Sequence, residues 1–124
     1  MKRLCAIRGA ITAENTKESI EKQTVRLIQE IVSQNKICAK DIVDFHFTLT
    51  KDLDVLNPAT ALRLNQDKFD FDVKTVPLFC SQEAFIQGGL ERCIRVMVTG
   101  YFNRKKIKFV YLEQARKLRP DISK

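Results

Sequence analysis

Two arginines stand in segments that otherwise have the composition of buried β-strands. Arg95 lies within Cys-Ile-Arg-Val-Met-Val at residues 93–98, and Arg8 lies in the mostly apolar segment 4–10. A guanidinium stays protonated at any ordinary pH, so in an apolar strand it must reach water, pair with an internal acid or hold an anionic ligand. The two arginines therefore indicate either structural ion pairs or an anion site.

Three more polar residues accompany the arginines at predicted strand positions. Glu83 follows a strand that contains Cys80, and Tyr111 lies within another strand. Each has a structural explanation by itself, because Glu83 or Glu113 could pair with an arginine and the tyrosine could be a core ring with its hydroxyl at the surface. As a set they suit a small anion that carries a hydroxyl group, since arginines bind carboxylates and a carboxylate accepts from a hydroxyl.

The elements that must position these residues begin with a strand at residues 4–10, in which Leu4, Ala6 and Arg8 share one face. Apolar residues at helical spacing then predict an amphipathic helix over residues 16–35, with Asn15 as its N-cap. Alternation over residues 42–50 predicts a second strand, whose packed face is formed by Val43, Phe45, Phe47 and Leu49.

The second half of the chain contains a short helix and more strands. Asn57 and Pro58 predict a helix start, so we expect a helix over residues 58–64 that carries Arg63. Residues 65–74 indicate a surface loop, and the strands expected next are residues 75–80, the segment that starts at Cys93, and residues 106–113. A short basic segment, residues 115–120, closes the chain.

This order predicts a single mixed α/β domain spanning residues 1–124, with about five strands and one long helix. One helix covers only part of such a sheet. The uncovered face predicts association with further copies of the chain.

Composition narrows the class of protein. The apolar fraction of 44% and the charged fraction of 30% are typical of a globular protein. No apolar run approaches the roughly 20 residues of a membrane helix, and the N-terminal residues do not resemble a signal peptide. We therefore expect a cytoplasmic protein without a membrane partner.

The potential metal ligands are few and scattered. The four cysteines include no Cys-x-x-Cys pair, and His46 is the only histidine, so we expect four reduced thiols and no metal site.

The formal charge of +7 allows an anionic partner or a basic surface. Basic residues interleaved with aromatic rings at 101–111 could bind nucleic acid, but without a recognised motif we favour a turn and a strand with one solvated face.

Along nearly its whole length the chain resembles the monofunctional chorismate mutases of the AroH type. The resemblance rests on the order and spacing of these segments: residues 7–12 (Ile-Arg-Gly-Ala-Ile-Thr), Asp52-Leu53, Pro58-Ala59, Arg63, Val76-Pro77, Cys80, Gln82-Glu83, Gly88-Gly89-Leu90, residues 93–97, residues 110–113 and residues 118–121. It implies a homotrimeric pseudo-α/β barrel with sites between subunits. It also implies the cofactor-independent Claisen rearrangement of chorismate to prephenate, a step toward phenylalanine and tyrosine.

The resemblance also implies roles for individual residues. Arg95 would contact the ether oxygen and the enolpyruvyl carboxylate, and we expect its apolar strand to keep this guanidinium desolvated, which would strengthen its effect on a developing oxyanion. Arg8 and Tyr111 would hold that carboxylate, and Glu83 would accept the substrate hydroxyl with Cys80 beside it. Arg63 of a neighbouring subunit would face the ring carboxylate. The remaining substrate-binding positions implied are Asn57, Ala59, Thr60, Phe79, Ser81, Gln82 and Leu118.

The chain departs from the family pattern at the expected entrance. Asn57 stands where an aromatic residue is usual, Thr60 stands where a lysine can occur, and Phe79 is bulkier than expected. The alternative function is a trimeric module that binds small anions or nucleic acid on the same fold without catalysis.

Overall fold

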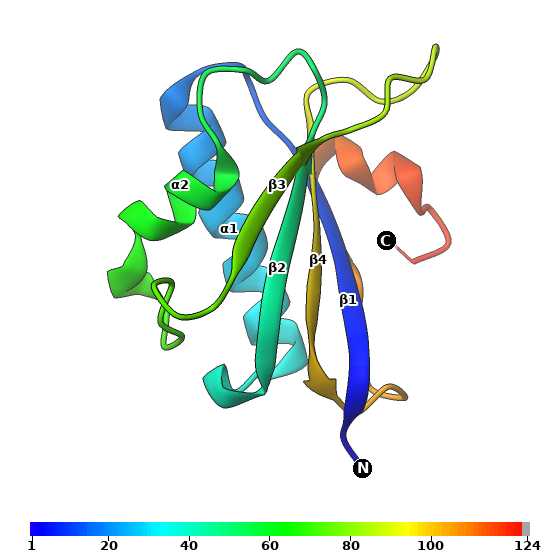
Figure 1. Cartoon of the computed structure of the whole chain (residues 1–124). Helices are drawn as coiled ribbons and strands as arrows, with labels where there is room; N and C mark the ends of the chain where they lie inside the picture. Colours follow the sequence, from blue (N-terminus) through cyan, green and yellow to red (C-terminus); the bar gives the residue numbers. More distant parts are fainter. Residues whose placement is uncertain (123–124) are drawn as a thin grey trace.

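A mixed sheet with the strand order β3-β2-β4-β1-β5 forms the centre of the computed structural model, which describes residues 1–122 (Figure 1). The helices and strands are β1 (Arg3–Thr12), α1 (Lys17–Asn35), β2 (Ile42–Leu49), α2 (Pro58–Leu64), β3 (Leu78–Gln82), β4 (Cys93–Phe102) and β5 (Val110–Tyr111). Short 3-10 helices are η1 (Ala39–Asp41), η2 (Gln66–Lys68) and η3 (Glu113–Leu118). The central strand β4 is antiparallel to both β1 and β2, while β3 and β5 are parallel additions at the two edges. The mixed α/β fold expected from the sequence is confirmed.

Both predicted helices form, and their caps explain where they begin. Asn57 caps α2 as expected, with its side chain accepting from the Ala59 N–H at 2.8 Å. Helix α1 is capped by Thr16, which accepts from the Ser19 N–H at 3.1 Å, and not by the neighbouring Asn15. The Asn15 amide instead donates to Asp54 at 2.8 Å, so this residue joins two loops.

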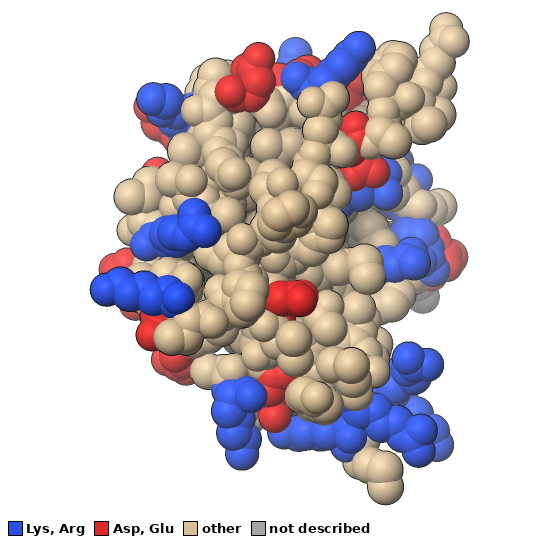
Figure 2. Space-filling model, viewed as in Figure 1, with Lys and Arg blue, Asp and Glu red and all other residues tan. Residues whose placement is uncertain are grey.

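Lysine and arginine side chains gather at one end of the molecule, near the N-terminus (Figure 2). The segment 104–108, which contains four basic residues, follows the end of β4 near the N-terminus (Figure 1), whereas Arg95 lies close to the start of the same strand. The basic end and Arg95 are therefore near opposite ends of the sheet.

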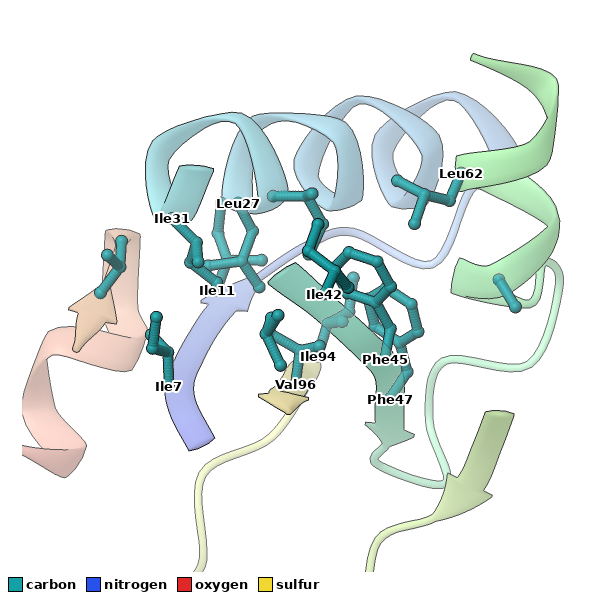
Figure 3. Packing of buried hydrophobic residues seen from close by; sticks show 14 of the residues in the cluster. Ile7, Ile11, Leu27, Ile31, Ile42, Phe45, Phe47, Leu62, Ile94 and Val96 are labelled. Carbon is teal, nitrogen blue, oxygen red and sulfur yellow. The ribbon is translucent and has the colours of Figure 1, made fainter. Parts of the chain in front are cut away.

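One face of the sheet packs against α1 and α2 (Figures 1 and 3). Phe45 and Phe47 of β2 and Ile94 of β4 are almost fully buried in this layer, together with Leu27 and Ile31 of α1. Burial of a large apolar side chain stabilises the fold by about 1.5 to 3 kcal/mol, so this layer is the main source of stability.

We call the opposite side of the sheet the open face. It carries the alternate residues of each strand, and η3 covers only its end near Ala10 and Cys93. The large apolar or aromatic residues Leu4, Phe79, Met97 and Tyr101 are exposed on the rest of this face in the single chain. Arg8 and Arg95 lie on the same face.

Two strands are shorter or later than the sequence indicates. The strand expected at 106–113 is reduced to two residues, because the Asn35 side chain at the end of α1 binds both the N–H and the carbonyl of Lys108. The strand expected at 75–80 begins only at Leu78, because a turn at Asp72 takes the N–H groups of Thr75 and Val76.

The expected burial of Val43 with Phe45 is wrong. A bulge between Ile42 and Asp44 shifts the pairing register with β4 and leaves Val43 exposed.

Candidate active site

Arg95 and Glu83 face each other at the loop end of the open face. Arg95 Nε lies 3.9 Å from Glu83 Oε2, and the two side chains are 46% and 27% exposed. Glu83 follows β3, and its N–H donates to the carbonyl of Leu49 at 2.7 Å, which extends the β2–β3 ladder by one residue and anchors the Glu83 backbone. Because both side chains are partly exposed to water, the pair contributes little to stability and remains accessible to a ligand.

The desolvated environment predicted for Arg95 is absent in the single chain. Its neighbours Ile94 and Val96 are buried against the helices, but strand alternation points Arg95 to the other, open face. Any desolvation of this guanidinium must therefore come from a ligand or from another chain.

Thr48 completes this group, and the sequence analysis missed it. It lies opposite Arg95 on β4 and opposite Ser81 on β3, and its hydroxyl donates to Glu83 Oε2. The predicted site residue Ser81 is paired differently, since its hydroxyl lies 2.9 Å from His46 Nε2. Thr48 could have been found from its position in the alternating segment 42–50, because it follows Phe47 directly and so points to the opposite face of the strand.

Arg8 belongs to the same face as Arg95. Ala10 of β1 is the partner of Arg95, and Arg8 lies two residues along the same strand, so the two arginines are diagonal neighbours. The Arg8 guanidinium also lies 6.0 Å from the centre of the Phe109 ring. Two cations on adjacent strands form a surface suited to a dianion.

Tyr111 and Leu118 lie beside β1, near Ala10. Tyr111 pairs with Ala10, and both Tyr111 and Leu118 pack on a small cluster around Ala10. Next to them the Arg119 guanidinium binds both carboxylate oxygens of Asp121, at 3.1 and 2.9 Å. This pairing is the main cause that raises the pKa of Arg119 and lowers the pKa of Asp121, and Tyr111 adds a smaller contribution to the arginine.

Cys80 and Gln82 are not brought to the open face. Cys80 pairs with Phe47, and its side chain packs on the helix-facing core, where burial raises the pKa of the thiol. Phe79, by contrast, is exposed on the open face, with its ring edge-on to His46 at 5.4 Å between centres.

The α2 residues also lie away from Arg95 within one chain. Within α2, Ala59 is buried, Thr60 is partly buried and Arg63 is exposed. Helix α2 packs on α1 and beside β3, in the helical layer behind the sheet. A single chain therefore does not join Asn57, Thr60 or Arg63 to the arginine pair.

A cavity of about 890 Å³ opens beside Arg95 and Glu83. Its far wall is the segment 84–92, with Phe85 and Ile86 exposed at the tip and Lys51 Nζ 3.9 Å from the centre of the Phe85 ring. The segment is tied back where the Arg92 N–H donates to both oxygens of Asp52, at 3.1 and 3.0 Å. The walls are thus partly apolar, and charged side chains that include Lys51, Asp52 and Arg92 line the cavity together with Arg95 and Glu83.

The described residues contain no group of three or more His, Cys, Asp or Glu side chains that could hold a metal ion. Across residues 1–122, no helix has the length and hydropathy needed to cross a membrane.

Comparison with known proteins agrees with this geometry. A family model described as "Chorismate mutase type I" matches residues 4–122. Chorismate mutase AroH of Bacillus subtilis is 39% identical over 121 residues, covering 94% of this chain and 91% of the relative. Chorismate mutase AroH of Thermus thermophilus is 34% identical over 120 residues, covering 94% and 93%. The solved structure of a chorismate mutase from Clostridium thermocellum is 39% identical, with a TM-score of 0.80, and covers 91% of this chain and 98% of its own.

Proposed function

Because the chain belongs to the type I chorismate mutase family, we propose that it converts chorismate to prephenate by a unimolecular rearrangement. The observation that carries the proposal is the pairing of Arg95 with Glu83 on the open face, beside Arg8. A cation for a developing negative charge and an acceptor for a hydroxyl are what this substrate requires.

The reaction explains why no nucleophile is needed. Breaking the ether C–O bond and forming the new C–C bond occur within one molecule, so an enzyme can act by holding the folded conformation and stabilising charge on the ether oxygen. We assign Arg95 to that oxygen and Arg8 with Tyr111 to the enolpyruvyl carboxylate. Glu83 accepts the substrate hydroxyl.

We further propose that the active form is a homotrimer. The exposed residues Leu4, Met97 and Tyr101 give the open face an apolar surface that a second copy would cover. The same association would supply Arg63 and Thr60 from the α2 of a neighbour, since α2 of the same chain lies behind the sheet. It would also reduce the exposure of Arg95, and a less hydrated cation stabilises a developing oxyanion more strongly.

A cytoplasmic location belongs to the same proposal. The four cysteines are all free in the structure, which fits a reducing compartment and a biosynthetic enzyme.

The test is loss of chorismate absorbance on adding purified protein without any cofactor, with prephenate identified by NMR. Folded Arg95→Ala protein serves as the control and should be almost inactive. If the wild-type protein leaves chorismate unchanged at the uncatalysed rate, the proposed function is wrong.

A further inference from the structure

We propose that Thr48 is a positioning residue that holds Glu83 away from Arg95 and so keeps both groups available for the substrate. The inference rests on the proposed function. It assigns a role to a residue on β2, a strand that supplies none of the assigned substrate contacts.

The first argument is the identity of the shared atom. Thr48 donates to Glu83 Oε2, and the contact of Arg95 Nε at 3.9 Å is to the same oxygen. Within residues 1–122 both interactions fall on Oε2, so Oε1 is the oxygen left to accept from a ligand hydroxyl. Because each oxygen of the Glu83 carboxylate has its own partner, the side chain must be held in one rotamer.

The second argument is the distance between the charges. A direct bond between a guanidinium N–H and a carboxylate is about 2.7 to 2.9 Å long, so at 3.9 Å the Arg95–Glu83 pair stops roughly 1 Å short of contact. The Glu83 backbone is anchored by its 2.7 Å bond to Leu49, but its side chain has three rotatable bonds. Without the Thr48 bond the carboxylate would be free to close onto Arg95 and neutralise the cation assigned to the ether oxygen.

The third argument is that the Thr48 hydroxyl is well suited to this restraint. Threonine is branched at Cβ, which limits its side-chain rotamers, and Thr48 sits partly buried between β3 and β4. The nearby hydroxyl of Ser81 is already paired with His46, so it is not positioned to replace Thr48.

The experiment compares Thr48→Val, which removes the hydroxyl at constant shape, with Thr48→Ser, which keeps it. We expect Thr48→Val to lower kcat about tenfold, equivalent to about 1.4 kcal/mol, with a smaller effect on KM. Thr48→Ser should recover most of the loss. Thr24→Val removes the hydroxyl of a buried threonine on α1, in the helical layer behind the sheet, so it is the matched control and should keep near-normal kcat.

A double-mutant cycle separates positioning from a structural role. In a Glu83→Gln background, Thr48→Val should have little further effect, because the charged group it positions is gone. A further tenfold loss in that background would show that Thr48 acts through the sheet and would overturn the proposal. Thermal unfolding of Thr48→Val should match wild type, since valine is a good strand former.

A crystal structure of Thr48→Val gives a readout independent of rate. We expect Glu83 to have closed on Arg95 to within about 3 Å. Suppose that the wild-type protein is active. If Thr48→Val then has the same kcat, or if Glu83 keeps its position in the variant, the positioning role is wrong while the proposed function stands. Inactive wild-type protein would overturn both.

Discussion

Arg8 and Arg95 project from adjacent strands on one face of the sheet, displaced by a single same-face position in the β1–β4 register. Among residues 1–122, the carboxylate that meets Arg95 is Glu83, at 3.9 Å on the side away from Arg8, and Arg8 forms no ion pair. Two neighbouring cations are costly to hold together unless an anion meets them, and their separate contacts predict separable effects on catalysis.

Replacing Arg95 with citrulline, its uncharged isostere, should lower kcat far more than it raises KM, because the contact to the ether oxygen strengthens only as the bond breaks. We expect a loss on the order of 10²- to 10³-fold in steady-state assays. Arg95→Lys should recover only part of it, since lysine lacks the planar fork. The matching change at Arg8 should act more on KM.

Both arginine variants should remain folded, because each side chain is exposed on the open face. Thermal unfolding is the control. Near-normal kcat in a folded Arg95→citrulline protein would make Arg95 a structural partner of Glu83 and nothing more.

The mass of the protein in solution should be three times the chain mass of 14.3 kDa, because the open face and the shared site both require neighbours. Met97→Asp places a charge in the exposed centre of that face and should shift the mass toward one chain, with loss of activity. Light scattering coupled to size-exclusion chromatography measures the mass of the wild-type protein and of the variant. A monomer with full activity would contradict the trimer.

Neutralising Lys105 and Lys106 should change little beyond the rate of encounter with a dianion. These residues follow the end of β4, whereas Arg95 is near its start, so the double change to glutamine should lower kcat/KM modestly at low salt and hardly at high salt. Rates measured across a salt series test this. Tight RNA or DNA binding that disappears in the variant would instead favour a nucleic-acid-binding module.

Gly100→Ala should be the most damaging of the glycine substitutions within the sheet. A Cβ at Gly100 would meet the backbone oxygen of Asp41 at 2.4 Å, and a backbone atom can yield only by moving the chain. At Gly9 the nearest atom, at 2.7 Å, is the flexible end of the Ile31 side chain. We expect about 3 kcal/mol lost at Gly100 and about 1 kcal/mol at Gly9, by urea unfolding at one fixed protein concentration. Equal losses would show that the Asp41 segment can move.

The cysteines should differ sharply in reactivity. Burial raises the pKa of the Cys93 thiol to about 11, even though the nearby Arg95 lowers it, so at pH 8 this thiol stays protonated and unreactive. Cys38 is exposed. Iodoacetamide at pH 8 should therefore modify Cys38 well before Cys93, as followed by peptide mass spectrometry, and modification of Cys93 should increase only as the pH rises toward 11. Equal labelling at pH 8 would mean that the sheet opens around Cys93.

Local sequence patterns predicted where helices and strands lie better than they predicted the contacts around them. The spacing of apolar residues located α1, and Asn57 with Pro58 located the start of α2. The short β5 could not be predicted, because its cause is the Asn35 side chain, 73 residues away from Lys108 in the sequence. The order of the strands in the sheet could not be predicted either, because it depends on contacts between residues that are similarly distant in the sequence.

For the site, the apolar composition of residues 93–98 predicted a buried strand but not which of its faces would be covered, so Arg95 was expected to be desolvated. The separation of Cys80 from Glu83 was open to prediction, since residues three apart in an extended chain point to opposite sides. The bond between Thr48 and Glu83 depends on the pairing of β2 with β3, which no local pattern specifies.

The position of β4 in the sheet also has a consequence for how the protein is made. β1 and β2 do not pair with each other, and the strand that joins them is β4, whose residues begin at Cys93. Before β4 is made, β2 can pair only with the short β3, and β1 has no partner strand. A ribosome must therefore synthesise about three quarters of the chain before β1 can join the sheet, and until then the apolar sides of β1 and β2 have only α1 and α2 to shield them. Closing such distant pairs is slow, so the nascent chain should depend on chaperones most strongly just before β4 emerges.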